Sequence, residues 1–158
     1  MQPSRAPELC CNPVGESAAA EIAALHRRAD PPGWSLDAWR GQLAQPATCC
    51  IGGWLDGTLV GFVTLGIAAG EAEVLMIAVD PAHRNAGLAR KLLRHALELA
   101  AERGAQTCFL EVAVDNAPAC ALYARCGFSQ VAVRKGYYAR GKGVVDALVL
   151  ARPLTRAA

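Results

Sequence analysis

The sequence predicts a single α/β domain with β-hairpins near its beginning and its end. Its 158 residues match the usual size of a domain with one hydrophobic core. Hydrophobic residues make up 53% of the chain and charged residues 19%, which is typical of a compact globule rather than a disordered chain. The apolar pattern switches between the helical and the strand period, and no repeat, low-complexity tract or linker interrupts it. We therefore expect one domain over residues 1–158.

Two helices are predicted before the first strand. The first spans residues 16–29, with Ser17 available as its N-cap, and the Asp-Pro-Pro-Gly run at 30–33 ends it. Ser35 caps the second helix, whose apolar residues recur at helical spacing until Pro46 stops it.

Six β-strands are predicted from apolar runs and from the turns between them. Asp56-Gly57 is a strong hairpin signal, and a glycine-rich turn at 140–143 separates the last two strands. Gly66 and Gly70 mark a bulge or a bend. The third strand is apolar on both faces toward its end, as a central strand would be. The predicted strands cover residues 48–55, 59–68, 71–79, 107–114, 131–138 and 144–151.

Two more helices follow the third and the fourth strand. The helix over residues 87–103 is the clearest in the chain, because its leucines and alanines form one stripe and Gly104 ends it. A shorter helix over residues 116–126 ends at Gly127.

Charge and hydropathy exclude several classes of protein. A net charge of +2 is too small to indicate binding to nucleic acid or to an anionic membrane. No apolar run reaches transmembrane length, because Glu71 and Glu73 interrupt the longest candidate. The first eleven residues lack a basic-then-apolar signal segment. We therefore expect a cytoplasmic location.

The seven cysteines favour neither disulfides nor a metal site. An odd number argues against a fully paired disulfide framework, and no C-x-x-C spacing occurs. Neighbouring residues on a strand point to opposite faces, so the pairs Cys10-Cys11 and Cys49-Cys50 are poorly placed for zinc. We expect reduced, mostly buried thiols and no bound metal. His26 and His95 are expected on the exposed surfaces of their helices.

One stretch suits an anion. A buried strand ends at Val79, a short polar loop follows, and a helix begins near Gly87. The first N–H groups of a helix have no internal partners, and the helix dipole places positive charge there. Small residues let that backbone approach a pyrophosphate, and Arg84 and Arg90 add charge at the rim. A plain strand–helix connection is the alternative on these grounds alone.

The same stretch resembles the acetyl-coenzyme A (acetyl-CoA) signature of the GCN5-related N-acetyltransferase (GNAT) superfamily. That signature is R/Q-x-x-G-x-G/A at the start of a long helix, and Arg84, Gly87 and Ala89 occupy its three defining positions. The likeness extends to the ribosomal-protein-alanine N-acetyltransferase (RimI) branch. Four further segments, within residues 71–153, carry it: Glu71-Ala72-Glu73, Leu110-Glu111-Val112, Ala121-Leu122-Tyr123 and Cys126-Gly127-Phe128.

The resemblance implies a GNAT fold, with one mixed, mostly antiparallel sheet flanked by helices. It also implies acetyl-CoA as co-substrate, with no metal. The residues implied in holding it are Ile77, Ala78, Val79, Arg84, Asn85, Ala86, Gly87, Leu88, Ala89, Arg90 and Asn116. Members of this branch often carry basic residues at the positions of Asn85 and Ala86, and glycine at that of Ala89. We therefore expect looser capture that depends on backbone N–H groups.

Acetyl transfer to an amine requires a base, an acid and a stabilised oxyanion. Glu111 is the candidate base, because it interrupts an apolar strand and partial burial would raise the pKa of its carboxyl. Tyr123 is the candidate acid; it lies two helical turns after Asn116, and a phenol can protonate a departing thiolate. The N–H of Ile77 suits the oxyanion. An exposed strand glutamate and a core tyrosine are the alternatives.

The resemblance favours transfer to the α-amino group of a protein or peptide, including a ribosomal protein. A modest base suits such an amine, which titrates near pH 8 in model compounds. Two alternatives stay open: acetylation of a small amine or amino acid, and a non-catalytic acyl-CoA sensor. The expected acceptor groove lies between the first two helices and the turn at 137–145, where the likeness is weakest. Arg134 and Arg140 are expected on a solvated face.

Overall fold

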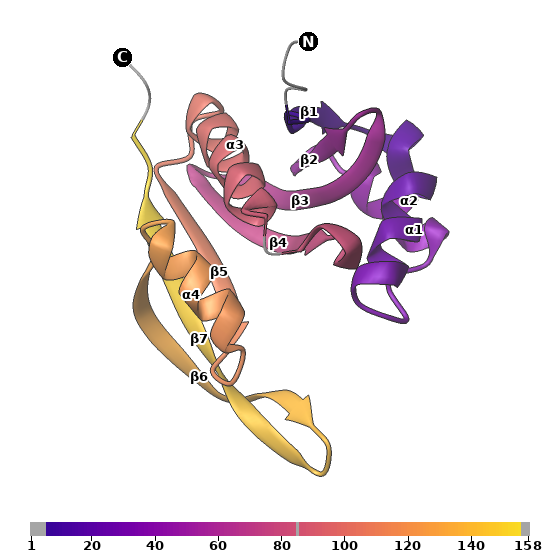
Figure 1. Ribbon diagram of the computed structural model, residues 1–158. Coiled ribbons are helices and arrows are strands. Elements are labelled where there is room, and N and C mark those ends of the chain that lie inside the picture. The colour runs from indigo at the N-terminus through magenta and orange to yellow at the C-terminus, as the bar shows by residue number, and fades with distance from the viewer. Residues whose placement is uncertain (1–5, 85, 156–158) are drawn as a thin grey trace.

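A computed structural model describes residues 6–84 and 86–155 and places seven strands in one sheet (Figure 1). The strand order is β1-β2-β3-β4-β5-β7-β6, and each neighbouring pair is antiparallel except β4 with β5. The predicted mixed, mostly antiparallel sheet is confirmed. The strands are β1 (Cys10–Val14), β2 (Thr48–Leu55), β3 (Thr58–Ala68), β4 (Glu71–Val79), β5 (Thr107–Ala113), β6 (Ser129–Arg140) and β7 (Gly143–Pro153).

Helices cover both faces of this sheet. The α-helices are α1 (Ala19–Ala29), α2 (Leu36–Ala44), α3 (Leu88–Glu102) and α4 (Ala117–Arg125), and the short 3₁₀ helices are η1 (Glu16–Ala18) and η2 (Pro81–His83). Leucines and alanines of α3, with Tyr123 of α4, pack on one face against Ile51, Val63 and Leu110. Helices α1 and α2 pack on the other face, where Trp39 meets Phe62 with ring centroids 5.1 Å apart. Each helix therefore buries one apolar stripe.

Several predicted boundaries are confirmed. Strands β2 and β4 cover the predicted residues, and the turn between β2 and β3 has positive φ at both Asp56 (47°) and Gly57 (78°). Those angles are the ones that a two-residue hairpin turn requires. Ser35 accepts a hydrogen bond from the Ala38 N–H at 3.1 Å, as expected of the N-cap of α2.

Other expectations were wrong. Ser17 lies inside η1, and Ala18, the N-cap of α1, makes no side-chain hydrogen bond. Strand β1 was not predicted; it is a short edge strand with Pro13, a residue that only an edge tolerates well. The irregularity near Gly66 falls on β4, where pairing passes from Thr64↔Met76 to Leu65↔Val74 and leaves Leu75 as a bulge.

His26 also differs from its expected place on an exposed surface. Its side chain is 2% exposed, and Nδ1 accepts hydrogen bonds from the Trp34 N–H at 3.0 Å and from the Trp39 Nε1–H at 3.1 Å. The imidazole of His26, on α1, therefore holds both the loop, through Trp34, and α2, through Trp39, in place by hydrogen bonds. Burial lowers the pKa of His26 from its ordinary value of 6.5.

The thiols are less buried than predicted. Cys49, Cys50 and Cys108 are buried, whereas Cys10 is exposed and the other three are half-buried, and all seven are unpaired. Among residues 6–84 and 86–155, no group of three or more His, Cys, Asp or Glu side chains is arranged to hold a metal ion. Within the same residues, no helix is both long and apolar enough to cross a membrane.

The depressed pKa of His26 predicts a loss of stability on mild acidification. The unfolded chain takes up this proton near pH 6.5, whereas the folded chain takes it up only at lower pH. Stability from neutral His26 is therefore complete above that pH and is lost as the pH falls toward the folded-state pKa. Urea unfolding at a series of pH values should show a flatter decline below about pH 6.5 for His26→Gln than for the wild type. His95→Gln is the control, and an undiminished slope in His26→Gln contradicts the assignment.

Candidate functional site

An opening between β4 and β5 forms the centre of the candidate site. The two strands pair only over Glu71–Glu73 with Thr107–Phe109 and then diverge (Figure 1). The opening contains a cavity of about 340 Å³, which is lined by residues of β4, β5, α4 and β6. A second cavity of about 260 Å³ also borders on Asp30, Met76 and Ile77 and continues past Val79 to the start of α3. The two cavities together form a channel along β4.

The loop before α3 is held by two contacts to α1. Asp80 accepts a hydrogen bond from the Ala82 N–H at 2.9 Å and forms an ion pair with Arg28 at 3.1 Å. The hydrogen bond first, and then the Arg28 guanidinium, lower the pKa of the Asp80 carboxyl. Arg84 donates from Nη2 to the Ala29 carbonyl at 2.8 Å. The predicted rim arginine therefore also ties the loop to the end of α1.

The start of α3 is open and uncapped. Gly87 is its N-cap, with φ of 74° and no side-chain cap, and nothing lies within 4 Å of the position that a Cβ would take there. Among the residues that the structure describes, no side chain caps the first N–H groups of α3, and these groups therefore suit an anion. Ala89 is half-buried and lines the channel. The side chain of Leu88 is buried in the core, so only the backbone of Leu88 faces the loop. Asn85, also predicted here, lies outside the described residues.

The other predicted cofactor residues divide between the two cavities. Ile77 borders both cavities, and Ala78 and Val79 line the one that reaches α3. Asn116 lines the larger cavity, and its Oδ1 accepts from the Ala119 N–H at 3.3 Å as the N-cap of α4. Ala86 and Arg90 are exposed.

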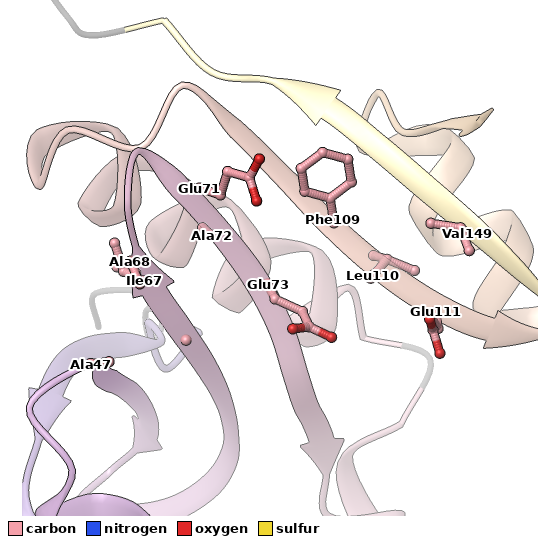
Figure 2. A pocket seen from close by; sticks show the side chains of 11 residues that line it. Ala47, Ile67, Ala68, Glu71, Ala72, Glu73, Phe109, Leu110, Glu111 and Val149 are labelled. Atoms are coloured by element: carbon pink, nitrogen blue, oxygen red, sulfur yellow. The ribbon is translucent and has the colours of Figure 1, made fainter. Parts of the chain in front are cut away.

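Glu111 lies on the face of β5 turned away from α3. Its neighbours Leu110 and Val112 point into the core, and its own side chain is 23% exposed. Figure 2 shows Glu111 and Phe109 of β5 beside Glu71 and Glu73 of β4, lining a cavity of about 430 Å³ on this face. Glu111 lines this cavity and the one in the opening. It is therefore reachable from the face of the sheet opposite α3.

Sequence reasoning missed the partner of Glu111. Arg134 of β6 donates from Nη1 to Glu111 Oε1 at 2.7 Å, and its Cζ stands 3.9 Å from the centroid of the Tyr137 ring. Arg140 pairs with Asp115 at 3.0 Å and lines the cavity in the opening. Both arginines are exposed, as predicted, and the order β5-β7-β6 also brings them to the site.

Two tyrosines face the same opening. Tyr123 is 7% exposed, and burial raises the pKa of its phenol to about 12. Its ring stands edge-on to Phe128, with centroids 5.9 Å apart. Tyr138 is half-buried in the same cavity, and burial followed by the charge of Glu111 raises the pKa of its phenol. At neutral pH, Tyr123 is therefore a protonated donor at the edge of the core.

Comparisons with known proteins agree with this geometry. A model of the acetyltransferase (GNAT) family matches residues 18–128. The [ribosomal protein bS18]-alanine N-acetyltransferase of Escherichia coli K12 is 37% identical over 100 residues, which cover 63% of this chain and 68% of that protein. The N-alpha-acetyltransferase RimI of Mycobacterium tuberculosis H37Rv is 39% identical over 123 residues and 75% of each chain. The crystal structure of the E. coli ribosomal-protein-S18-alanine N-acetyltransferase superposes with a TM-score of 0.86 at 28% identity, covering 96% of this chain and 97% of that one.

The left-handed backbone at Gly87 predicts a measurable cost for any side chain there. Gly87→Ala should lose roughly 1–2 kcal/mol of unfolding free energy, because φ is positive although the space is free. Gly41→Ala is the matched control: it also has free space but lies inside α2, so it should gain up to about 1 kcal/mol. Urea unfolding measures both, and a Gly87→Ala protein as stable as the wild type contradicts the helix start described above.

Proposed function

The chain belongs to the acetyltransferase (GNAT) family and is an acetyl-CoA-dependent N-acetyltransferase, and we propose that its acceptor is the N-terminal α-amino group of a protein. One observation carries the proposal: the opening between β4 and β5 gathers Glu111, Asn116 and Tyr123 beside Ile77. The names of the two relatives, one acting on a ribosomal-protein alanine and one called an N-alpha-acetyltransferase, support the choice of acceptor.

Acetyl-CoA would lie along the channel beside β4. Beyond Glu73 the edge of β4 that faces β5 has no strand partner, so backbone groups near Ile77 are available to an extended chain of amides. The uncapped N–H groups at the start of α3 suit the pyrophosphate, with Gly87 and Ala89 leaving room for it. When bound, the cofactor supplies an activated acetyl thioester.

Glu111 acts as the general base in this proposal. The α-amino group of a protein titrates near pH 8, so a carboxylate of modest strength is sufficient to take its proton. The Arg134 guanidinium, 2.7 Å from Glu111 Oε1, holds the carboxylate in position. Because Glu111 is reachable from the face opposite α3, the amine approaches from that face and the cofactor from the other.

Tyr123 acts as the general acid. A buried phenol with a pKa of about 12 stays protonated across the physiological range and can donate to the departing thiolate. The N–H of Ile77 is proposed to stabilise the negative charge that develops on the thioester oxygen. We further propose that residues 1–158 act as one catalytic domain and that the reaction takes place in the cytoplasm, where ribosomal proteins are made.

The acceptor is tested with matched amines. Incubation with acetyl-CoA should acetylate a peptide that begins with a free alanine at its α-amino group, as located by tandem mass spectrometry. The same peptide with a formylated N-terminus should remain unmodified even when it contains lysine, because a lysine amine of pKa about 10.4 holds its proton more firmly. Faster acetylation of free amino acids or polyamines than of the peptide would overturn the proposed acceptor.

Removing the phenol tests the acid. Tyr123→Phe should lower kcat by roughly a hundredfold or more, which is the usual contribution of a general acid, while the dissociation constant for acetyl-CoA stays unchanged. Steady-state kinetic assays give kcat, and calorimetry gives the dissociation constant for acetyl-CoA. Tyr137→Phe, which removes the phenol of an exposed ring on β6, is the control. Unaltered turnover in Tyr123→Phe removes this residue from the mechanism.

A further inference from the structure

The pairing of β6 with β7 is irregular opposite Asp146. The register passes from Arg134↔Ala147 to Tyr138↔Val145, so three residues of β6 stand opposite the single residue Asp146 of β7. This arrangement is a β-bulge with two extra residues on β6. A β-bulge changes the direction in which the side chains of its strand point. The bulge therefore decides which residues of β6 reach the opening between β4 and β5.

The bulge places Tyr138 at the opening. Paired residues of an antiparallel ladder share one face of the sheet. The β7 partners of Arg134 and Tyr138 are two positions apart, so both side chains point to the same face. With a regular register, Tyr138 would pair two residues farther along β7, about 7 Å away at 3.3 Å per residue. Arg134 would then keep its place beside Glu111, whereas Tyr138 would lie farther from the cavity that it now lines.

The side chain of Asp146 holds the bulge. Gly136, inside the bulge, has no partner in the ladder of β6 and β7, and its N–H donates to Asp146 Oδ1 at 2.9 Å. The φ of Gly136 is 63°, a left-handed conformation that glycine adopts readily. The carboxylate thus replaces the carbonyl that a regular ladder offers to this N–H. A single side-chain hydrogen bond therefore fixes the irregular register.

The backbone of Asp146 supports the neighbouring strand. Its carbonyl accepts from the Val114 N–H at 2.9 Å, directly after the last residue of β5. Asp115 follows, and its carboxylate pairs with Arg140 of β6. The contact to Val114 does not depend on the side chain of Asp146. A substitution at Asp146 therefore removes the contact to Gly136 and leaves the end of β5 in place.

We propose that Asp146 is a positioning residue for acetyl transfer, which acts through Gly136 to hold Tyr138 and Arg140 at the acceptor side of the opening. The lining of the opening, as far as the structure describes it, does not include Asp146. Alternation along β7 also turns its side chain away from the face that carries Arg134 and Tyr138. The inference rests on the proposed function and extends it to a residue outside the site.

Three substitutions at one position test this. Asp146→Asn keeps an Oδ1 acceptor, Asp146→Leu keeps the approximate volume without an acceptor, and Asp146→Ala removes both. Hydrogen exchange of the Gly136 amide, followed by NMR, should be about tenfold or more faster in the two variants without an acceptor. Asp146→Asn should exchange nearly as slowly as the wild type.

Steady-state kinetics with a peptide that begins with alanine give the second measurement. KM for the peptide should rise about ten- to a hundredfold in Asp146→Leu and Asp146→Ala, the range of one hydrogen bond to a charged group. The value of kcat should stay within about threefold of the wild type, because Glu111 and Tyr123 keep their places. Asp146→Asn should restore KM. The dissociation constant for acetyl-CoA should be unchanged in all three variants.

The outcomes separate this inference from the proposed function. Glu98→Ala, at an exposed carboxylate of α3, is the control and should match the wild type throughout. An unaltered KM in Asp146→Leu and Asp146→Ala, or an equal rise in Asp146→Asn, overturns the positioning role and leaves acetyl transfer standing. Loss of acetyl-CoA binding in both variants without an acceptor means that Asp146 supports the whole fold, which also overturns it. A wild type that acetylates no peptide α-amine overturns both.

Discussion

β4 and β5 are the one parallel pair of strands in the described sheet, and they share only three residue pairs before they diverge. The candidate site occupies the space between the diverging strands. Helix α3 connects β4 to β5 along the chain, as a parallel pair of strands requires. This helix packs against the sheet outside the opening between the two strands. The bulge at Leu75 bends β4 at the point where pairing with β5 has ended. An unpaired strand edge is normally a liability, but here cavities border it and helices flank it. The same feature thus exposes backbone hydrogen-bonding groups and makes room for a ligand that needs them.

Charge is separated across the sheet in a way that the net value of +2 conceals. Glu71, Glu73 and Glu111 lie on the face opposite α3 (Figure 2), whereas cations of α3 and α4 line a cavity on the other face. The potential is therefore negative on the face from which the proposed acceptor amine approaches and positive on the face that holds the start of α3. This arrangement separates the proposed acceptor from the phosphates of acetyl-CoA.

Local pattern predicted the elements well, and long-range contacts account for what it missed. Asp56-Gly57 was recognisable as a hairpin turn from residue type alone, and Gly87 was recognisable as a small residue at the start of a helix. Glu111 and Tyr123 were predicted from the resemblance, and both line the opening. The ion pair of Glu111 with Arg134 was out of reach, because it depends on β6 lying outside β7 in the sheet. His26 was misplaced for a similar reason: helical spacing cannot show that the loop residue Trp34, eight positions later, returns to cover the imidazole.

The acceptor side of the opening is built from two segments with little in common. Asp30, at the end of α1, lines it from one side, and Tyr138 and Arg140 of the β6–β7 hairpin line it from the other. The first segment is held by His26 through the backbone of Trp34. The second is held by the pairs Arg134–Glu111 and Arg140–Asp115. The first support is a buried imidazole, whereas the second consists of ion pairs at the rim. Substitutions at the second support can therefore reshape the groove without disturbing the channel along β4. Acceptor choice is therefore free to vary on this fold while use of the cofactor is retained, which explains why the sequence identifies the donor site more readily than the amine.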